Sequence, residues 1–252
     1  MQATEQNVQW LVLYMTFPFS SMPKPILQFL LLICLSSCGK MDKTFSIHGH
    51  IENASDGDTI GIASFTGDTV LVEVAHCTVK RKRFSLQGIV EHPTPLYLRY
   101  KEQNCYHYHM FFMEKGDIGI FIDTTGCRVT GTPLNDLRNS IEDSITSYLA
   151  KLSEIEKLYY TTELNAGQLA RLSACGLNLQ ERLVSYLHTA VKENIHNPVG
   201  LYLLVVYNRL FATEELNTLI KQIPDSIIFG SNMPFHTTLT AILEERKNTQ
   251  ME

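Results

Sequence analysis

Hydrophobic and polar residues alternate along the segment from residue 44 to about residue 130. In its opening stretch, TFSIHGHI, the residues Phe45, Ile47 and Ile51 fall on one face, because successive side chains of a strand point to opposite faces. Short runs rich in Gly, Asp and Pro separate such stretches and indicate turns. The pattern predicts eight strands, at 44–51, 59–65, 69–79, 83–90, 95–100, 106–114, 117–123 and 128–130. Because no long helix intervenes, we expect an antiparallel β-sandwich or partly open barrel.

After Pro133 the apolar residues recur every three or four positions, which is the period of a helix. The first of these helices should cover about 26 residues, and its apolar stripe is close to a heptad repeat. The stripe consists of Leu134, Leu137, Ile141, Ile145, Tyr148, Leu152, Ile155 and Tyr159. Further helices are predicted at 166–193, broken or kinked at Gly176, and at 199–211, 213–223 and 233–246. Asn197 and Pro198 supply an N-cap and a first-turn proline for the helix at 199–211. The apolar face of this helix is broad, so we expect the helix to lie centrally in the helical domain. The fold class is therefore α+β, with a β domain at 44–132 and an all-helical domain at 133–252.

The N-terminal segment carries a ten-residue apolar run, 26–35 (ILQFLLLICL). Ten helical residues span about 15 Å, half of a bilayer core, so the run is too short for a transmembrane helix. Its length suits the apolar region of a secretory signal, with Lys24 as the preceding positive charge. We expect residues 1–37 to be a signal peptide. Its true start is predicted at Met22, because the 21 residues before it contain an acid and no base.

The four residues Leu35-Ser36-Ser37-Cys38 resemble the lipobox of bacterial lipoproteins. In that class the cysteine is acylated and the signal is cut just before it, which implies lipidation of Cys38 at the head of a tether, 38–43. Two or three acyl chains hold a protein stably to a membrane. Gly39 in place of an aspartate favours the outer membrane in sorting of the enterobacterial kind. An ordinary signal peptide with a chance cysteine is the alternative, and the periplasmic and outer faces are both open.

Composition excludes two classes of protein. With 44% hydrophobic residues and a net charge of −5, the 252-residue chain can bury a core and is unlike a disordered protein. The excess of acidic over basic residues argues against nucleic-acid binding. One compact basic run, 80–83 (KRKR), is interpreted as a solvated turn.

Three short motifs follow one another along the chain: Glu114-Lys115-Gly116-Asp117-Ile118, then 129–135 (VTGTPLN), and then Glu193-Asn194 with Asn197-Pro198. In this order they resemble the domain of unknown function 4369 of bacterial envelope lipoproteins. In most members of this family a thioredoxin-like domain follows, and its redox motif is Cys-x-x-Cys. This chain reaches Glu252 without any Cys-x-x-Cys, so thiol-disulfide catalysis is not carried over. The resemblance implies an accessory region that acts alone or a truncated gene.

Two His-x-His pairs are the candidate metal ligands, His48 with His50 and His107 with His109. Residues two apart on a strand share a face, so each pair could offer two imidazoles to one metal ion. The second pair precedes Glu114 as His-x-His-x4-Glu, which is similar to the first metal motif of cupins, but that motif's glycine and the second motif with its third histidine are missing. Surface histidines are therefore the favoured interpretation, and no cofactor is expected.

Four cysteines remain after the predicted cleavage and acylation: Cys77, Cys105, Cys127 and Cys175. Buried thiols are the simplest interpretation, and one disulfide within the β domain stays open. Aromatic residues gather around one hairpin and are expected to be core rather than a ligand groove. They are Tyr97, Tyr100, Tyr106, Tyr108, Phe111 and Phe112.

We therefore expect a non-catalytic envelope lipoprotein that binds or scaffolds a partner, held to the membrane by Cys38. A separately encoded thioredoxin-like protein is one candidate partner. The heptad stripe at 134–159 is the candidate contact surface, with packing inside the helical domain as its alternative. The other functional class is a remnant or split half of a thiol-disulfide oxidoreductase.

Overall fold

The computed structural model describes residues 44–66, 70–102, 105–228 and 233–249. The predicted signal peptide, the start at Met22 and the tether with Cys38 lie outside the described residues. Among the helices that the structure describes, none is long and apolar enough to cross a membrane.

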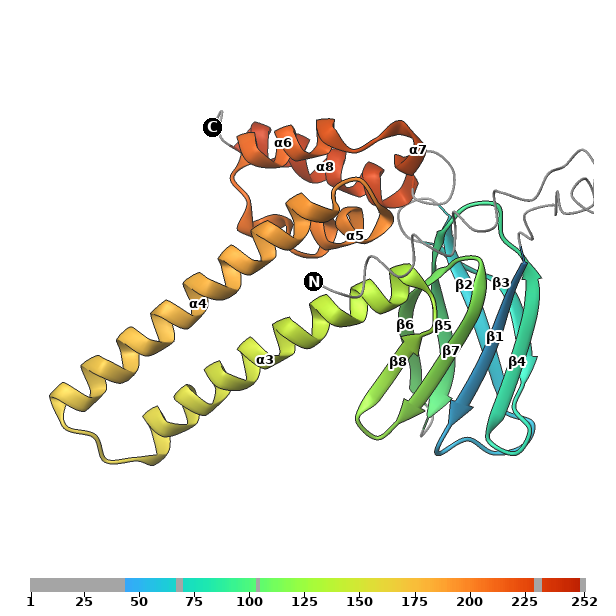
Figure 1. The fold of residues 1–252 in the computed structure, drawn as a ribbon, viewed down its shortest axis with the longest axis horizontal. Coiled ribbons are helices and arrows are strands. Elements are labelled where there is room, and N and C mark those ends of the chain that lie inside the picture. Colours follow the sequence, from blue (N-terminus) through green and yellow to red (C-terminus); the bar gives the residue numbers. More distant parts are fainter. Residues whose placement is uncertain (1–43, 67–69, 103–104, 229–232, 250–252) are drawn as a thin grey trace, which may run out of the picture. The chain divides into compact units, whose positions relative to one another are not determined.

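Eight strands build two four-stranded sheets (Figure 1). The first sheet has the order β4-β1-β7-β8, formed by β1 (Thr44–Ile51), β4 (Arg83–Ile89), β7 (Gly116–Asp123) and β8 (Gly126–Thr130). The second has the order β3-β2-β5-β6, formed by β2 (Thr59–Thr66), β3 (Val70–Thr78), β5 (Thr94–Glu102) and β6 (Cys105–Met113). The predicted positions of all eight strands agree with these bounds to within a few residues.

The two sheets pack face to face around one apolar core. Fully buried isoleucines from both sheets meet there, including Ile47 and Ile118 of the first sheet and Ile62 of the second. The α+β class and the sandwich are therefore confirmed. The expectation of antiparallel pairing fails for one pair, because β1 and β7 run parallel, with Ile47 opposite Ile118. Five strands separate β1 from β7 along the chain, which gives ample length for the return that parallel pairing requires.

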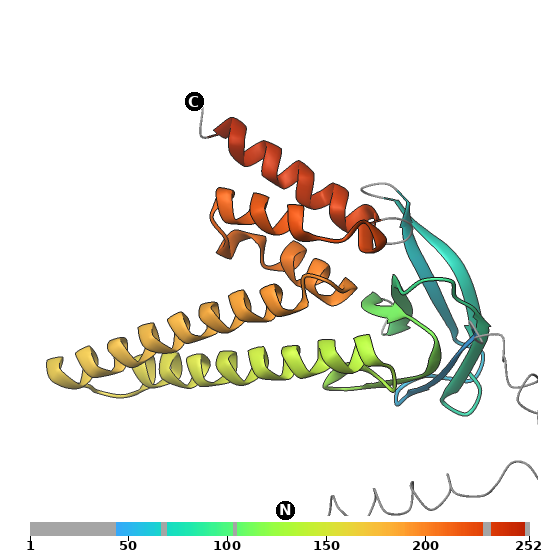
Figure 2. The same ribbon diagram turned by 45° about the horizontal axis from the view of Figure 1, so that its top comes forward.

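Two long helices follow the sandwich and run antiparallel to each other, α3 (Pro133–Thr161) and α4 (Ala166–Asn194) (Figures 1 and 2). Asn165 starts α4 with a reciprocal capping box, in which the side chains of Asn165 and Gln168 each accept from the other residue's backbone N–H. The predicted break at Gly176 is wrong, because α4 is continuous. Gly176 instead faces Ile155 of α3, where a Cβ atom would lie 3.6 Å from the Ile155 side chain, an ordinary van der Waals contact.

The remaining helices are short. Asn197 caps the first of them, as its sequence predicts, by accepting from the N–H groups of Val199 and Gly200. That helix ends at Val206 rather than at 211, and a turn of 3₁₀ helix, η2, replaces its last residues. The elements are α5 (Pro198–Val206), η2 (Asn208–Leu210), α6 (Thr213–Gln222), α7 (Asp225–Ile228) and α8 (Met233–Thr249).

The helices share a second core with one face of the second sheet. Alternate residues of β6 serve the two cores: Phe111 lies between the sheets, whereas Met110 and Phe112 pack with the helices. The fully buried Leu201, Leu203 and Leu204 make α5 the centre of this second core, as the broad apolar face of that segment predicts. The sandwich and the helices are thus joined through β6.

Candidate functional site

The residues of the first two family motifs meet where β6 ends and α3 begins. The carboxylate of Glu114, just after β6, accepts hydrogen bonds from the backbone N–H groups of Leu134 (2.8 Å) and Asn135 (3.3 Å). Thr132 occupies the N-cap position but makes no capping bond with its side chain. A carboxylate is favourable at this position because the first N–H groups of a helix have no partner within the helix and carry partial positive charge. Glu114 therefore caps α3 from a distant point in the sequence.

Two glycines make this junction sterically feasible. Gly116 has a φ of +119° and Gly131 a φ of +94°. Residues other than glycine rarely adopt such positive φ values. A Cβ atom at Gly131 would also lie 2.5 Å from the backbone oxygen of Asp117. The N–H of Gly131 donates to the side chain of Asp136 (3.0 Å), which fixes the turn into α3. The two glycines of the motifs thus allow the backbone turns that bring the end of β6 and the start of α3 together.

Polar side chains in the first two turns of α3 bond to one edge strand of each sheet. β6 and β8 are edge strands, whose outward backbone groups would otherwise lack partners. Asn135 bonds both backbone groups of Phe112, Arg138 donates to the backbone oxygen of Met110, and Asn139 donates to the oxygen of Val129. These three side chains are buried. The start of α3 therefore supplies hydrogen-bond partners to both edge strands near their C-terminal ends.

Arg138 is the one buried cation of this region that the structure describes, and its charge is partnered. Its Nε atom donates to Oε1 of Glu142 at 2.8 Å, and its guanidinium lies 5.4 Å from the ring centre of Tyr202 on α5. Arg138 thus joins α3 to β6 through its hydrogen bond to Met110 and to α5 through Tyr202, while the half-buried Glu142 balances its charge. Burial, aided by the charge of Arg138, lowers the pKa of His109 from 6.5 to about 4.

Comparison with known families places this junction inside a family domain. Residues 45–137 match the family described as Domain of unknown function (DUF4369). The chain contains a DUF4369 domain. The match ends two residues beyond Asn135, so the DUF4369 domain includes the first turn of α3 together with all eight strands. No curated protein sequence matches the chain.

The third motif lies beyond the DUF4369 match and also has a structural role. Asn194 and Asn197 are hydrogen-bonded to each other (3.0 Å) across the turn from α4 into α5. Gly200 sits tightly against this turn, where a Cβ atom would lie 1.9 Å from the backbone oxygen of Asn194. The motif thus forms a tight helix-to-helix connection.

The two His-x-His pairs lie in different sheets. His48 and His50 are on the outer face of the first sheet, where His48 is hydrogen-bonded to Ser46 (2.8 Å) and His50 is stacked on Phe121. His107, on β6 of the second sheet, is stacked on Tyr100. Within the described residues no group of three or more His, Cys, Asp or Glu side chains could hold a metal ion. Glu114, the additional ligand of the cupin-like pattern, is engaged at the start of α3.

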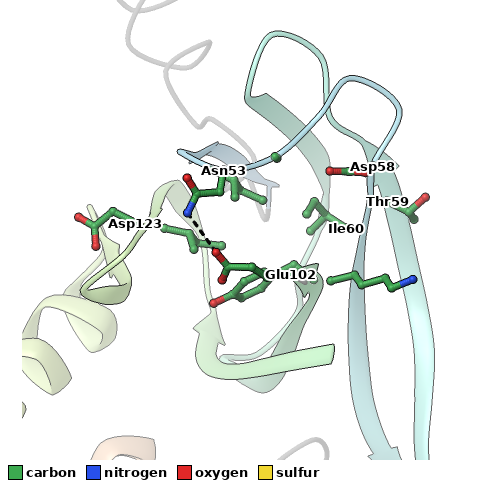
Figure 3. Close-up of a pocket in the computed structure, with 11 residues that line it drawn as sticks. Asn53, Asp58, Thr59, Ile60, Glu102 and Asp123 are labelled. Atoms are coloured by element: carbon green, nitrogen blue, oxygen red, sulfur yellow. Dashed lines mark hydrogen bonds between the residues drawn. The ribbon is translucent and has the colours of Figure 1, made fainter. Parts of the chain in front are cut away.

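A small cavity lies at the end of the sandwich where β1 and β5 finish (Figure 3). Its volume is about 20 Å³, which is enough for about one water molecule and too little for a metabolite. At its rim the side-chain amide of Asn53 donates to the carboxylate of Glu102 (3.0 Å; Figure 3). We therefore assign this cavity no substrate.

The four cysteines of the described residues are all free, so the open alternative of a disulfide does not occur among them. Cys77 and Cys127 are half-buried, whereas Cys105 and Cys175 are exposed. Burial raises the pKa of Cys77 and raises that of Cys127 to about 12. These two shifts are opposite to the lowered pKa of a catalytic thiolate.

The aromatic cluster of the β5–β6 hairpin divides between two environments. Phe111 and Phe112 are fully buried and Tyr100 is nearly so, as expected for core residues. Tyr106 and Tyr108 are instead about half exposed, on the end of β6 that α3 does not cover. Sequence reasoning missed Arg138 and Asn139, although Asn135, Arg138 and Asn139 follow the i, i+3, i+4 spacing of one helix face beside the apolar stripe.

Proposed function

We propose that this protein is a lipid-anchored protein of the bacterial cell envelope that acts as a non-catalytic binding or scaffold module. The observation that carries the proposal is Leu35-Ser36-Ser37-Cys38, directly behind the apolar run 26–35. Acyl chains on Cys38 anchor the chain, and Gly39 favours the outer membrane. The six residues 38–43 span at most about 20 Å when extended, so the sandwich stays close to the bilayer.

The role of the family motifs supports a non-catalytic function. Glu114, Asn135 and the two asparagines of the third motif are engaged in hydrogen bonds that join strands to helices or one helix to the next. Cys127, the most buried thiol of the described residues, has a pKa of about 12 and is a poor nucleophile. We propose accordingly that the protein does not itself exchange thiols and disulfides.

The far half of the α3–α4 hairpin, residues 146–186, is the proposed contact surface for a protein partner, and we call it the arm. The heptad stripe is largely engaged within the molecule, since Tyr148 packs on Tyr186 (6.0 Å between ring centres) and Ile155 faces Gly176. The last residue of the stripe, Tyr159, and other apolar side chains of the arm are exposed to solvent. They are Leu149, Leu158, Tyr159, Tyr160, Leu177 and Val184. By analogy with the family, a thioredoxin-like protein is the proposed partner.

Metabolic labelling tests the anchor. Cells expressing the full-length protein are grown with radiolabelled palmitate, and we expect label in the protein and none in the Cys38→Ala variant. Cys34→Ala is the matched control, because Cys34 lies inside the predicted signal, and it should leave labelling unchanged. Equal labelling of wild type and Cys38→Ala would remove the lipoprotein assignment.

Site-specific photo-crosslinking in cells tests the arm. A photoreactive phenylalanine analogue at Tyr160, which is 76% exposed, should give a discrete crosslinked band. The same analogue at the exposed Glu91, outside the arm, is the control and should give none. Identical band patterns at the two positions would exclude the arm as a specific contact.

An insulin-reduction assay tests the non-catalytic assignment. The purified protein with dithiothreitol should reduce insulin no faster than dithiothreitol alone. Turnover above that background, lost on replacing Cys105 or Cys175, would establish the oxidoreductase instead.

A further inference from the structure

The outer face of the first sheet carries an open hollow with a volume of about 1180 Å³. None of the residues that line it is acidic. Its polar lining is dominated by groups that carry or can acquire positive charge: Lys80, Arg81, Arg83, His48 and His50. In a chain with a net charge of −5, such a segregation of cations creates a local field that attracts anions.

The hairpin turn that supplies the cations adopts an unfavourable backbone conformation. The turn joins β3 to β4 and closes through the bridge between Lys80 and Arg83. Its two central residues, Arg81 and Lys82, have φ values of 52° and 60°, although Asn and Gly are the residues that suit such turns. All four basic residues of the turn are exposed. The backbone N–H of Arg81 donates to Asp56, and the backbone oxygen of Lys82 accepts from Ile51, so two hydrogen bonds to residues 51–56 hold the turn. Basic side chains thus occupy positions where the backbone alone favours others, which argues for a role of these charges.

An aromatic ring lies beside the cations. Phe121 is 49% exposed, and its ring is stacked on His50 with 5.4 Å between centres and an interplanar angle of 11°. His50 also lies opposite Arg83 on β4. In a neighbouring pair of residues on β1 and β7, Gly119 lies opposite His48 and adds no side chain to the floor of the hollow. A flat apolar ring is therefore available next to charged donors.

We propose that this hollow binds an anionic glycan. The guanidinium and ammonium groups take its carboxylate or phosphate groups, because charge-assisted hydrogen bonds to such groups are the strongest that side chains make. The exposed face of Phe121 stacks against a sugar ring. The cations lie at the end of β1 opposite to Thr44, roughly 20 Å along the strand, which directs them away from the side where the chain enters the sandwich. The proposal does not depend on acylation of Cys38.

Calorimetric titration of the full-length protein in a mild non-ionic detergent tests the ligand class. The probe is hexagalacturonate, and maltohexaose provides the same number of uncharged rings. We expect binding of hexagalacturonate that weakens as salt is raised from 50 to 300 mM, since exposed charges are screened. Maltohexaose should not bind. Absence of hexagalacturonate binding, or equal binding of both sugars, would overturn the proposal.

Paired variants locate the site. Arg81→Asn with Lys82→Gly places favoured residues in the turn while removing one cation that lines the hollow, Arg81, and its neighbour Lys82, so the fold should be kept and binding weakened about tenfold. Lys151→Asn with Lys157→Asn removes two exposed cations from α3 and is the matched control, with unchanged binding expected. Equal weakening by both pairs would show an unspecific charge effect and contradict the site.

A second comparison tests the sugar ring. Phe121→Ala should weaken hexagalacturonate binding and leave the binding of polyphosphate, an anion without rings, unchanged. If both probes are unaffected, the stacking role of Phe121 is wrong. Tighter binding of single-stranded DNA, or of soluble short-chain phosphatidylglycerol, than of hexagalacturonate would replace the glycan with a nucleic acid or a lipid headgroup.

Discussion

The side chain of Asn135 completes the hydrogen bonding of Phe112 on the neighbouring edge strand. Its Oδ1 atom accepts from the backbone N–H of Phe112 (2.9 Å), and its Nδ2 atom donates to the backbone oxygen of the same residue (2.7 Å). One amide thus replaces the residue of a further strand that would pair with β6. Because Asn135 is 1% exposed, water cannot substitute for it. The edge of the second sheet is therefore closed by a helix side chain.

Replacing Asn135 by Ala should lower the free energy of unfolding by about 3 kcal/mol, since two buried backbone groups lose their partners. Urea unfolding followed by circular dichroism measures the change. Asn178→Ala, at an exposed position of α4, is the control and should change stability by less than about 0.5 kcal/mol. A loss at Asn135 as small as that of the control would contradict the role of this amide.

Glu114→Ala should destabilise the protein by about 1–2 kcal/mol, because two N–H groups at the start of α3 lose their acceptor. Glu114→Gln keeps a side-chain oxygen and should recover part of the loss. Glu154→Ala, on the exposed side of α3, provides the comparison for losing a carboxylate elsewhere on the helix. The cap would be refuted by finding Glu114→Ala and Glu154→Ala equally stable.

Stability should fall as the pH drops from about 6.5 towards 4, because of His109. Its pKa is about 4 in the folded protein and 6.5 ordinarily, so between these values the unfolded chain binds a proton that the folded protein does not. The effect should reach about 2 kcal/mol at pH 4.5. His109→Gln should reduce this pH dependence, whereas His92→Gln, on an exposed loop, should preserve it. Unfolding curves at several pH values measure this dependence. The same pH dependence of the free energy of unfolding in all three proteins would exclude His109 as the cause.

Alkylation should distinguish the cysteines. At pH 8, iodoacetamide should modify Cys105 and Cys175 first, because both are exposed. Cys127 should react at least about tenfold more slowly, since its pKa of about 12 leaves little thiolate. Mass spectrometry of the peptides over time gives each rate. In denaturant the rates should converge, and equal rates in the native protein would contradict the raised pKa of the half-buried Cys127.

Local sequence signals predicted most elements of the fold correctly. Period-two alternation located the strands, and asparagine caps such as Asn197 located helix starts, because both depend on residues close in the chain. The break predicted at Gly176 failed because intrinsic propensity is weak, and packing of α3 against α4 keeps the helix continuous. The parallel pairing of β1 with β7 could not be predicted from local signals either, since it joins segments about 70 residues apart.

The roles of the motif residues required the tertiary structure. The sequence determined that Glu114, Gly131 and Asn135 belong to one family pattern, which the DUF4369 match confirmed. It could not show that Glu114 caps α3 or that Asn135 pairs with Phe112, because a hydrogen bond between residues 20 apart leaves no local period. Likewise, 80–83 was identified as a basic turn from sequence, but only the folded sheet places it beside His50 and Phe121. Neighbouring residues determine local backbone preferences. A covered sheet edge, a helix cap from a distant residue or a charged hollow forms only when distant segments pack together.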